Sequence, residues 1–304
     1  MTSQPVVIPL PDGDQLVADY YPGTQAGGGR LLVIAHGLEG NSQRPYVQGL
    51  AQAAQAQGFA VLAWNFRSCG RADNLTERFY NAGCSDDLDA VITWAQEQGH
   101  PKLYLAGFSM GGNVTLKWLG EAGTSAVNRG VAGAVAISVP CDLMGCTREL
   151  GRARNTLYRR RFVSDLKARL RRKAAKFPGH FDLRALDSIR TVLAFDDAYT
   201  APMHGYRDAA DYYQQCSSLG FLQSIRVPTL LLNARNDPFL SATSYPEAVA
   251  RTHQYVHLEA PEQGGHVGFF SRDHQWWADQ RTLAFLETAL APSPARQPVQ
   301  ELSA

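Results

Sequence analysis

The hydrophobic residues in the first half of the chain fall into short runs separated by glycine and turn residues. Four almost unbroken apolar runs of β-forming residues occupy positions 31–35, 60–64, 102–106 and 130–137. Strands this apolar are typical of a parallel sheet that helices cover on both faces. Amphipathic segments of helical length lie between them, at 46–57, 86–98 and 110–121. The alternation predicts a doubly wound α/β fold.

The second half continues this pattern after an interruption. Two further buried strands are expected at 228–233 and 254–258, with a helix near 245–251 between them and a last helix at about 276–290. Near the N-terminus, the segments 6–9 and 15–18 flank a turn at Pro11-Asp-Gly13 and predict a hairpin added to the edge of the sheet.

The segment between about residues 141 and 220 has no strand pattern and is rich in arginine, aromatic residues and helix formers. We interpret it as a helical cap inserted into one α/β domain, since 304 residues suit one such core better than two equal halves. The predicted organisation is a core at 1–140, a cap at 141–220, the rest of the core at 221–291 and a loose tail at 292–304.

Composition narrows the class of protein. With 45% hydrophobic and 19% charged residues, the chain resembles an ordinary globular protein, and a net charge of +1 gives no reason to expect nucleic acid as a partner. Five cysteines without a CxxC pair argue against a disulfide framework and predict reduced, buried thiols. The N-terminus lacks the pattern of a signal peptide, so a cytoplasmic location is expected.

The residues Gly107-Phe-Ser109-Met-Gly111 match G-x-S-x-G, the motif of a nucleophile elbow. The string alone is weak evidence, but it directly follows a predicted strand and opens a predicted helix. That setting presents the serine hydroxyl at the carboxyl end of the strand. Ser109 is therefore the candidate nucleophile.

A serine nucleophile needs backbone donors for the oxyanion that forms on the attacked carbonyl. The N–H of Met110, at a helix N-terminus, is one candidate. The N–H of Leu38, in the loop His36-Gly-Leu-Glu-Gly40 after the preceding core strand, is the second. His36 is expected to support that loop by hydrogen bonding and not to titrate in catalysis.

In this fold the catalytic acid and histidine follow late strands, in the order serine, acid, histidine. Asp237 follows the strand predicted at 228–233, and His266 follows the next one between glycines. Asp142 is a rival acid because it also follows a strand. Asp196 and Asp197, an acidic pair in the cap, could lie near the mouth of the pocket, but such a pair is expected to cap a helix or pair with arginine. No HExxH or phosphate-loop motif is present in the sequence, so neither metal nor cofactor is expected.

These residues predict a serine hydrolase that cleaves a small-molecule carboxylic ester through an acyl-enzyme. Two alternatives remain at this point: transfer of the acyl group to an alcohol by the same residues, and a non-catalytic ligand-binding protein on a hydrolase scaffold. The oligomeric state is not predicted.

Several longer strings carry a family resemblance that extends from about residue 31 to residue 270. They are HGLEG at 36–40, NFRSCG at 65–70, GFSMGGN at 107–113, FDD through APMHGY at 195–206, NARNDPF at 233–239 and GGHVGF at 264–269. The chain closely resembles the YheT-like α/β-hydrolases, which are related to plant EMB-type and animal abhydrolase lipid esterases. The resemblance implies Ser109, Asp237 and His266 as the triad and acyl esters of short to medium chain as substrates. This chain has Asn81 where the family has a histidine.

The cap contains one strongly basic stretch. Residues 148–176 hold twelve Lys or Arg against only Glu149 and Asp165. Apolar residues at helical spacing predict an amphipathic helix or helix pair that roofs the pocket: Leu150, Leu157, Phe162, Leu166 and Leu170. Its charged face is expected to be solvated or paired with acidic residues of the core. A second hypothesis is that the charged face attracts an anionic substrate or contacts an anionic lipid surface.

Overall fold

The computed structural model describes residues 2–24, 27–269 and 277–288. Eight strands form one sheet in the order β1-β2-β4-β3-β5-β6-β7-β8. Their bounds are β1 Gln4–Pro9, β2 Gln15–Tyr21, β3 Arg30–Ala35, β4 Ala60–Trp64, β5 Lys102–Phe108, β6 Val131–Ile137, β7 Thr229–Leu232 and β8 Val256–Glu259. β1 and β2 are antiparallel to each other, β2 is antiparallel to β4, and the remaining pairs are parallel. The predicted doubly wound fold is confirmed.

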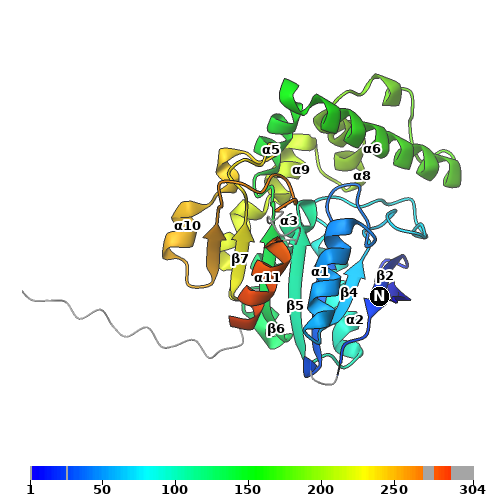
Figure 1. Cartoon of the computed structure of the whole chain (residues 1–304). Helices are drawn as coiled ribbons and strands as arrows, with labels where there is room; N and C mark the ends of the chain where they lie inside the picture. The colour runs from blue at the N-terminus through cyan, green and yellow to red at the C-terminus, as the bar shows by residue number, and fades with distance from the viewer. Residues whose placement is uncertain (1, 25–26, 270–276, 289–304) are drawn as a thin grey trace, which may run out of the picture.

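The helices of the core cover both faces of the sheet. They are α1 Pro45–Ala56, α2 Ser85–Glu97, α3 Met110–Ala122, the short α4 Thr124–Asn128, α10 Glu247–Thr252 and α11 Trp277–Thr288. α1 and α11 lie side by side on one face (Figure 1), and α2 and α3 pack on the other. Alternate residues of a strand explain this division: Leu31 and Val33 pack toward α2 and α3, whereas Leu32 and Ile34 pack toward α1 and α11.

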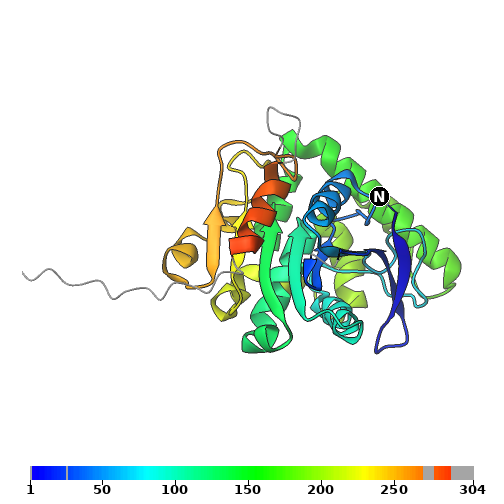
Figure 2. The same cartoon turned by 60° about the horizontal axis from the view of Figure 1, so that its bottom comes forward.

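The predicted N-terminal hairpin is present, and it forms one edge of the sheet, with β8 at the other edge (Figure 2). Gly13 in its turn has φ +81°, a conformation that favours glycine. β8 was expected to be a buried strand, and that expectation is wrong because only Val256 of its four residues is buried. An edge strand has a neighbour on one side only, and β8 is correspondingly half open to solvent.

The region between β6 and β7 is helical, as predicted. It contains α5 Leu143–Gly151, α6 Thr156–Lys176, α7 Val192–Phe195, α8 Ala201–Met203 and α9 Ala209–Cys216, and these helices lie above the carboxyl ends of the strands (Figure 1). Ten buried residues of this region and its surroundings, including Phe79, Leu166 and Phe195, form a hydrophobic cluster separate from those of the sheet. The domain boundaries given above stay a prediction.

The helix between β7 and β8 starts later in the chain than predicted. The helix expected at 245–251 begins at Glu247, because residues 242–244 form a separate 3₁₀ turn and Pro246 precedes the first helical residue. The tail at 292–304, together with positions 276, 289 and 290 of the last helix, lies outside the described residues. All five cysteines are free and buried, as predicted. In the part of the chain that the structure describes, no helix has both the length and the apolar character needed to cross a bilayer.

Candidate active site

Ser109 stands at the sharp turn between β5 and α3. Its φ of +53° is rare for a residue other than glycine and marks a strained turn. The flanking glycines are required by space: a Cβ at Gly107 would lie 2.4 Å from the carbonyl oxygen of Gly111, and one at Gly111 would lie 2.4 Å from that of His36. The turn therefore has the form expected of a nucleophile elbow, with the serine at the carboxyl end of the strand.

The structure brings the three predicted side chains into one hydrogen-bonded row. His266 Nε2 lies 3.0 Å from Ser109 Oγ, and His266 Nδ1 lies 2.8 Å from Asp237 Oδ2. Asp237 is buried, and its other oxygen accepts a hydrogen bond of 2.9 Å from the N–H of Phe239. The Asp237 carboxylate is thus fixed in orientation and faces the imidazole with one oxygen.

The loop that carries His266 is attached to the sheet by a neighbouring strand. The N–H of Val267 donates to Ser138 Oγ at 3.0 Å, and Ser138 directly follows β6. The Phe239 ring packs against the imidazole with 4.6 Å between ring centres. These contacts limit the movement of the histidine between its two partners.

The two predicted oxyanion donors also border the same space. Met110 is the first residue of α3, so its N–H has no acceptor within the helix. Leu38 lies in the loop after β3, which passes so close that a Cβ at Gly37 would be 3.2 Å from the Cβ of Ser109. Leu38, Met110, Ser109 and His266 all line one cavity.

His36 supports this loop, as expected. It is fully buried, its Nδ1 lies 2.8 Å from the carbonyl oxygen of Gly37, and its Nε2 accepts a hydrogen bond of 3.2 Å from the N–H of Phe66. Burial lowers the pKa of His36 to about 3. The imidazole is therefore neutral at physiological pH and acts as a hydrogen-bonding spacer between two loops.

The rival acid Asp142 has hydrogen-bond partners other than the histidine. Its Oδ1 accepts from the N–H of Gly145 and caps α5, and its Oδ2 accepts from the Thr243 hydroxyl. Asp197 accepts a hydrogen bond from the N–H of Ala209 at the start of α9, which agrees with the capping role expected for the pair. For Asp196 the expected capping or arginine pairing is wrong, and the alternative, a place near the pocket, agrees with the structure. Its carboxylate contacts two hydroxyl groups and lines the cavity beside Ser109.

Two hollows meet at Ser109. The inner cavity has a volume of about 110 Å³ and a mostly apolar wall that includes Met110, Leu143 and Leu166. The outer groove, of about 460 Å³, is bordered by the loop after β3 and by the start of α6. Both share the same five residues: Leu38, Ser109, Phe162, Phe239 and His266. The serine hydroxyl thus lies where an ester could place one half in each hollow.

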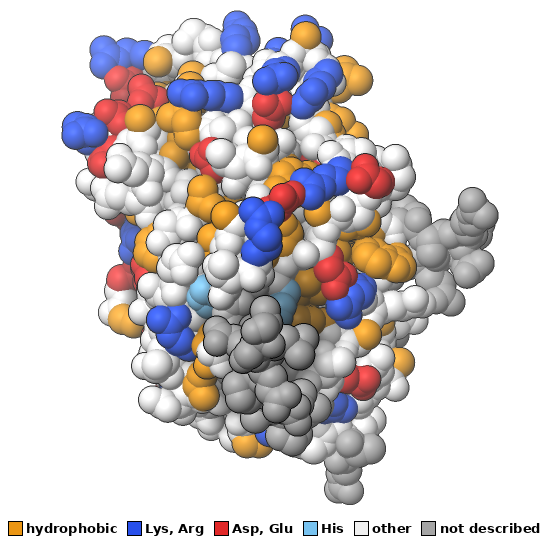
Figure 3. Space-filling view, turned by 90° about the vertical axis from the view of Figure 1, so that its left-hand side faces the viewer, with side chains coloured by type: hydrophobic (Ala, Val, Ile, Leu, Met, Phe, Trp, Pro, Cys, Tyr) orange, Lys and Arg blue, Asp and Glu red, His pale blue; other side chains and the backbone are white. Residues whose placement is uncertain are grey.

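The basic cap stretch covers the end of α5, a 3₁₀ turn at Ala153–Asn155 and the single long helix α6. Lys and Arg side chains gather along the top of the molecule, over the cap (Figure 3). Arg169 and Lys173 are buried and pair with Glu39 and Asp73 of the core, as expected, whereas others pair with acidic residues of the cap or lie exposed. Contact with an anionic lipid surface stays a prediction.

The apolar face predicted for the cap is partly wrong. Leu150, Phe162 and Leu166 line the inner cavity and Leu170 is buried, but Leu157 is 80% exposed. Leu157 is the second residue of α6 and lies nine positions, or about two and a half turns, before Leu166, so it is on the opposite face of that helix. Leu150 belongs to α5, which ends at Gly151, so the predicted stripe does not continue from one helix into the other.

One contact of the site could not be anticipated from the sequence. The carboxylate of Glu39, next to Leu38, pairs with Arg169 of α6, 130 positions away along the chain. For Asp196, which faces the inner cavity, a place near the pocket was the less favoured alternative. The signal for it was an acidic residue within a largely apolar and aromatic stretch.

Known proteins resemble this chain over most of its length. The model of the α/β-hydrolase fold family matches residues 30–273. A protein of Escherichia coli strain K12 named “Putative esterase YheT” is 36% identical over 92% of this chain and 84% of its own length. A mouse protein named phospholipase ABHD3 is 28% identical, over 88% of this chain and 68% of its own length.

Among solved structures, an esterase of Pyrococcus furiosus superposes with a TM-score of 0.64 at 20% identity. The alignment covers 94% of this chain and 91% of the esterase chain, and at this identity it supports the fold alone. The matched family model and the identity to the Escherichia coli protein together decide the family. The chain belongs to the α/β-hydrolase fold family and, within it, to the YheT-like group of carboxylic ester hydrolases.

Proposed function

We propose that the protein hydrolyses carboxylic esters with Ser109 as nucleophile, His266 as general base and Asp237 as the acid that orients the histidine. The observation that carries the proposal is the continuous row of hydrogen bonds, 3.0 Å from Ser109 to His266 and 2.8 Å from His266 to Asp237. This constellation activates serine hydroxyls in hydrolases of several unrelated folds.

The reaction proceeds in two halves. Ser109 Oγ attacks the ester carbonyl while His266 Nε2 takes its proton, and the backbone N–H groups of Leu38 and Met110 bind the oxyanion. The proton then passes to the alcohol as the ester bond breaks, leaving an acyl-enzyme on Ser109. Water, deprotonated by His266, attacks the acyl-enzyme and releases the acid.

The acyl group occupies the inner cavity and the alcohol lies in the outer groove. The apolar inner wall suits a hydrocarbon chain, and the larger groove leaves room for varied alcohols. An apolar cavity of about 150 Å³ holds benzene, so about 110 Å³ suits roughly four or five carbon atoms. Short acyl chains are therefore the preferred substrates, at the lower end of the range that the family resemblance implies.

The test is a series of p-nitrophenyl esters from acetate to octanoate, assayed with the wild type and with Ser109→Ala. We expect a maximum near butyrate and a loss of turnover in the variant of about 10³-fold or more. Ser125→Ala, a surface serine on α4, is the matched control and keeps full activity. Equal turnover by Ser109→Ala and the wild type would refute the assignment.

A further inference from the structure

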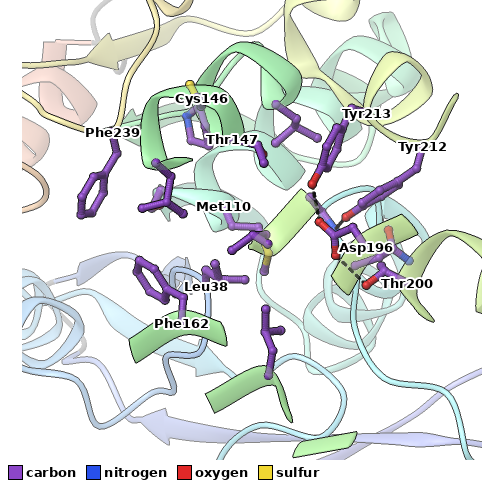
Figure 4. Close-up of a pocket in the computed structure, with 18 of the residues that line it drawn as sticks. Leu38, Met110, Cys146, Thr147, Phe162, Asp196, Thr200, Tyr212, Tyr213 and Phe239 are labelled. Carbon is purple, nitrogen blue, oxygen red and sulfur yellow. Dashed lines mark hydrogen bonds between the residues drawn. The ribbon is translucent and has the colours of Figure 1, made fainter. Parts of the chain in front are cut away.

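The inner cavity is not apolar throughout. Asp196, which is only 8% exposed, lies in its wall on a turn of π-helix formed by residues 196–200 between α7 and α8. Figure 4 shows Asp196, Thr200 and Tyr213 on the opposite side of the cavity from Phe162. Turns of π-helix are rare and are frequent at functional sites. One side of the acyl cavity thus carries a buried carboxylate.

This carboxylate has acceptor capacity to spare. Asp196 Oδ1 accepts from the Thr200 hydroxyl at 2.6 Å, and Oδ2 accepts from the Tyr213 hydroxyl at 2.5 Å. A carboxylate can accept about four hydrogen bonds, so roughly half of its capacity is unused. No lysine, arginine or histidine within the described ranges forms an ion pair with it. Burial raises the pKa of Asp196 to about 6.

Two unused donors border the same cavity. Asn81, 6% exposed, accepts a hydrogen bond from the N–H of Gly83 with its Oδ1, and its Nδ2 has no acceptor among the residues that the structure describes. The Tyr212 hydroxyl accepts from the N–H of Ala82 at 2.6 Å and likewise has no acceptor in that part of the chain for its own proton. Asn81 and Tyr212 can therefore each donate to a bound group.

We propose that Asn81, Asp196 and Tyr212, together the polar end of the cavity, bind a hydroxyl group on the acyl chain of the substrate. The inference rests on the proposed function, because the acyl chain reaches this end from Ser109. A hydroxyl both donates and accepts, so it can donate to Asp196 and accept from Asn81 or Tyr212. A hydrocarbon end would leave the spare acceptor capacity of Asp196 and the unused donors of Asn81 and Tyr212 without a partner, and an ammonium group would satisfy only the carboxylate. The preferred substrates are thus short hydroxyacyl esters.

The experiment compares kcat/KM for three groups of ethyl esters, with acid release followed by titration at constant pH. The parent esters are ethyl butyrate and ethyl pentanoate. Their hydroxy forms are ethyl 3-hydroxybutyrate and ethyl 5-hydroxypentanoate, and the corresponding methoxy esters can accept a hydrogen bond but cannot donate one. We expect at least one hydroxy ester to exceed its parent by about 10-fold or more, and to exceed its methoxy form similarly.

Variants then locate the preference. In Asp196→Asn and in Asn81→Ala the ratio of hydroxy to parent ester should fall toward one. Asp182→Asn, an exposed aspartate paired with Arg184, is the matched control and keeps the ratio of the wild type. Thermal unfolding of each variant identifies any that fails to fold. If Asp196→Asn fails to fold, Asn81→Ala still provides the test.

Three outcomes would overturn the inference: no hydroxy ester preferred over its parent, methoxy esters preferred equally, or a preference that survives in the folded variants. In each case the proposed function stands if the parent esters are hydrolysed by the wild type and not by Ser109→Ala. A failure of the proposed function would appear in the comparison of the wild type with Ser109→Ala, whereas a failure of the hydroxyl site would appear in the comparison of the hydroxy esters with their parents.

Discussion

Arg169 of the cap forms a buried, two-point ion pair with Glu39, the residue that follows Leu38 in the loop after β3. The Nε–Oε1 distance is 3.1 Å and the Nη2–Oε2 distance is 2.7 Å, with side chains only 5% and 6% exposed. Glu39 has φ +54°, a strained value for glutamate. The Tyr80 hydroxyl also donates to Glu39, at 2.6 Å. The cap helix thus holds the backbone next to the proposed oxyanion donor.

Replacing Arg169 should therefore impair turnover more than binding. Arg169→Met leaves Glu39 buried without its cation and frees the Leu38 backbone to move. We expect kcat to fall by about 10- to 100-fold with KM nearly unchanged, and stability to fall by about 3–5 kcal/mol. Steady-state kinetics at a temperature well below unfolding, with urea denaturation, separate the two effects.

Arg171→Met is the matched control, since Arg171 is on the same helix, is 52% exposed and pairs with an exposed aspartate. Arg171→Met should leave kcat, KM and stability as in the wild type. A stability loss in Arg169→Met with kcat unchanged would mean that the ion pair supports the fold alone and does not position the loop.

Shortening a side chain of α6 that lines the inner cavity should enlarge the cavity and lengthen the preferred acyl chain. Leu166 lies on α6, is 4% exposed and lines the inner cavity. Leu166→Ala removes the equivalent of about three methylene groups, at a stability cost of about 2–5 kcal/mol. We expect the best p-nitrophenyl ester to become two or three carbons longer.

Leu157→Ala is the comparison for this change, because Leu157 is on the same helix and 80% exposed. It should leave the chain-length profile as in the wild type. A profile that does not move in Leu166→Ala would show that the acyl chain lies elsewhere, for example in the outer groove.

Asp279 predicts a dependence of stability on pH. It is 5% exposed in the first turn of α11, and burial raises its pKa to about 7 from an ordinary value of 3.8. Between these values the folded state holds a proton that the unfolded state has lost. The stabilising contribution of the protonated Asp279 to the free energy of unfolding is therefore fully present below about pH 4. It decreases by up to about 1.4 kcal/mol per pH unit above that and is lost once the pH has risen through 7.

Asp279→Asn removes this loss, so urea denaturation should find the variant more stable than the wild type at pH 8 and closer to it at pH 4.5. Glu287→Gln, an exposed change on the same helix, provides the baseline. An Asp279→Asn variant that is less stable than the wild type at pH 8 would contradict the prediction and indicate that the ionised carboxylate has a stabilising partner.

The hypothesis of lipid contact can be tested on the exposed part of α6. Arg160 and Arg172 are exposed and form no ion pair with any residue in the described ranges. We expect weak sedimentation with phosphatidylglycerol vesicles at low salt, and less of it in Arg160→Glu/Arg172→Glu. Phosphatidylcholine vesicles are the control. Equal sedimentation with both lipids would count against an electrostatic attraction.

The sequence predicted local and ordered features well. Periodicity located the strands, and the elbow glycines, the order of the three side chains and the strand ends predicted Ser109, Asp237 and His266 in one place. Contacts between distant segments were not predictable, because no local pattern links Arg169 to Glu39. For Asp196 the sequence offered both a capping role and a place near the pocket, and nothing local decided between them. The apolar face predicted for the cap failed at Leu157 because α5 ends at Gly151 and α6 begins anew at Thr156, which places Leu157 on the opposite face of α6 from Leu166.

The hydrogen bond from Val267 to Ser138 bears on which substitutions the protein can accept without disturbing the active site. β6 supplies none of the three reacting side chains, yet its end sets the depth at which the imidazole sits. The positions of the serine, the aspartate and the histidine are set by the ends of adjacent parallel strands, whereas half of the residues that line the inner cavity come from the insertion above them. Substitutions of residues that line the cavity from the insertion, unlike a substitution of Arg169, can therefore alter which molecules are accepted while Ser109, His266 and Asp237 stay aligned.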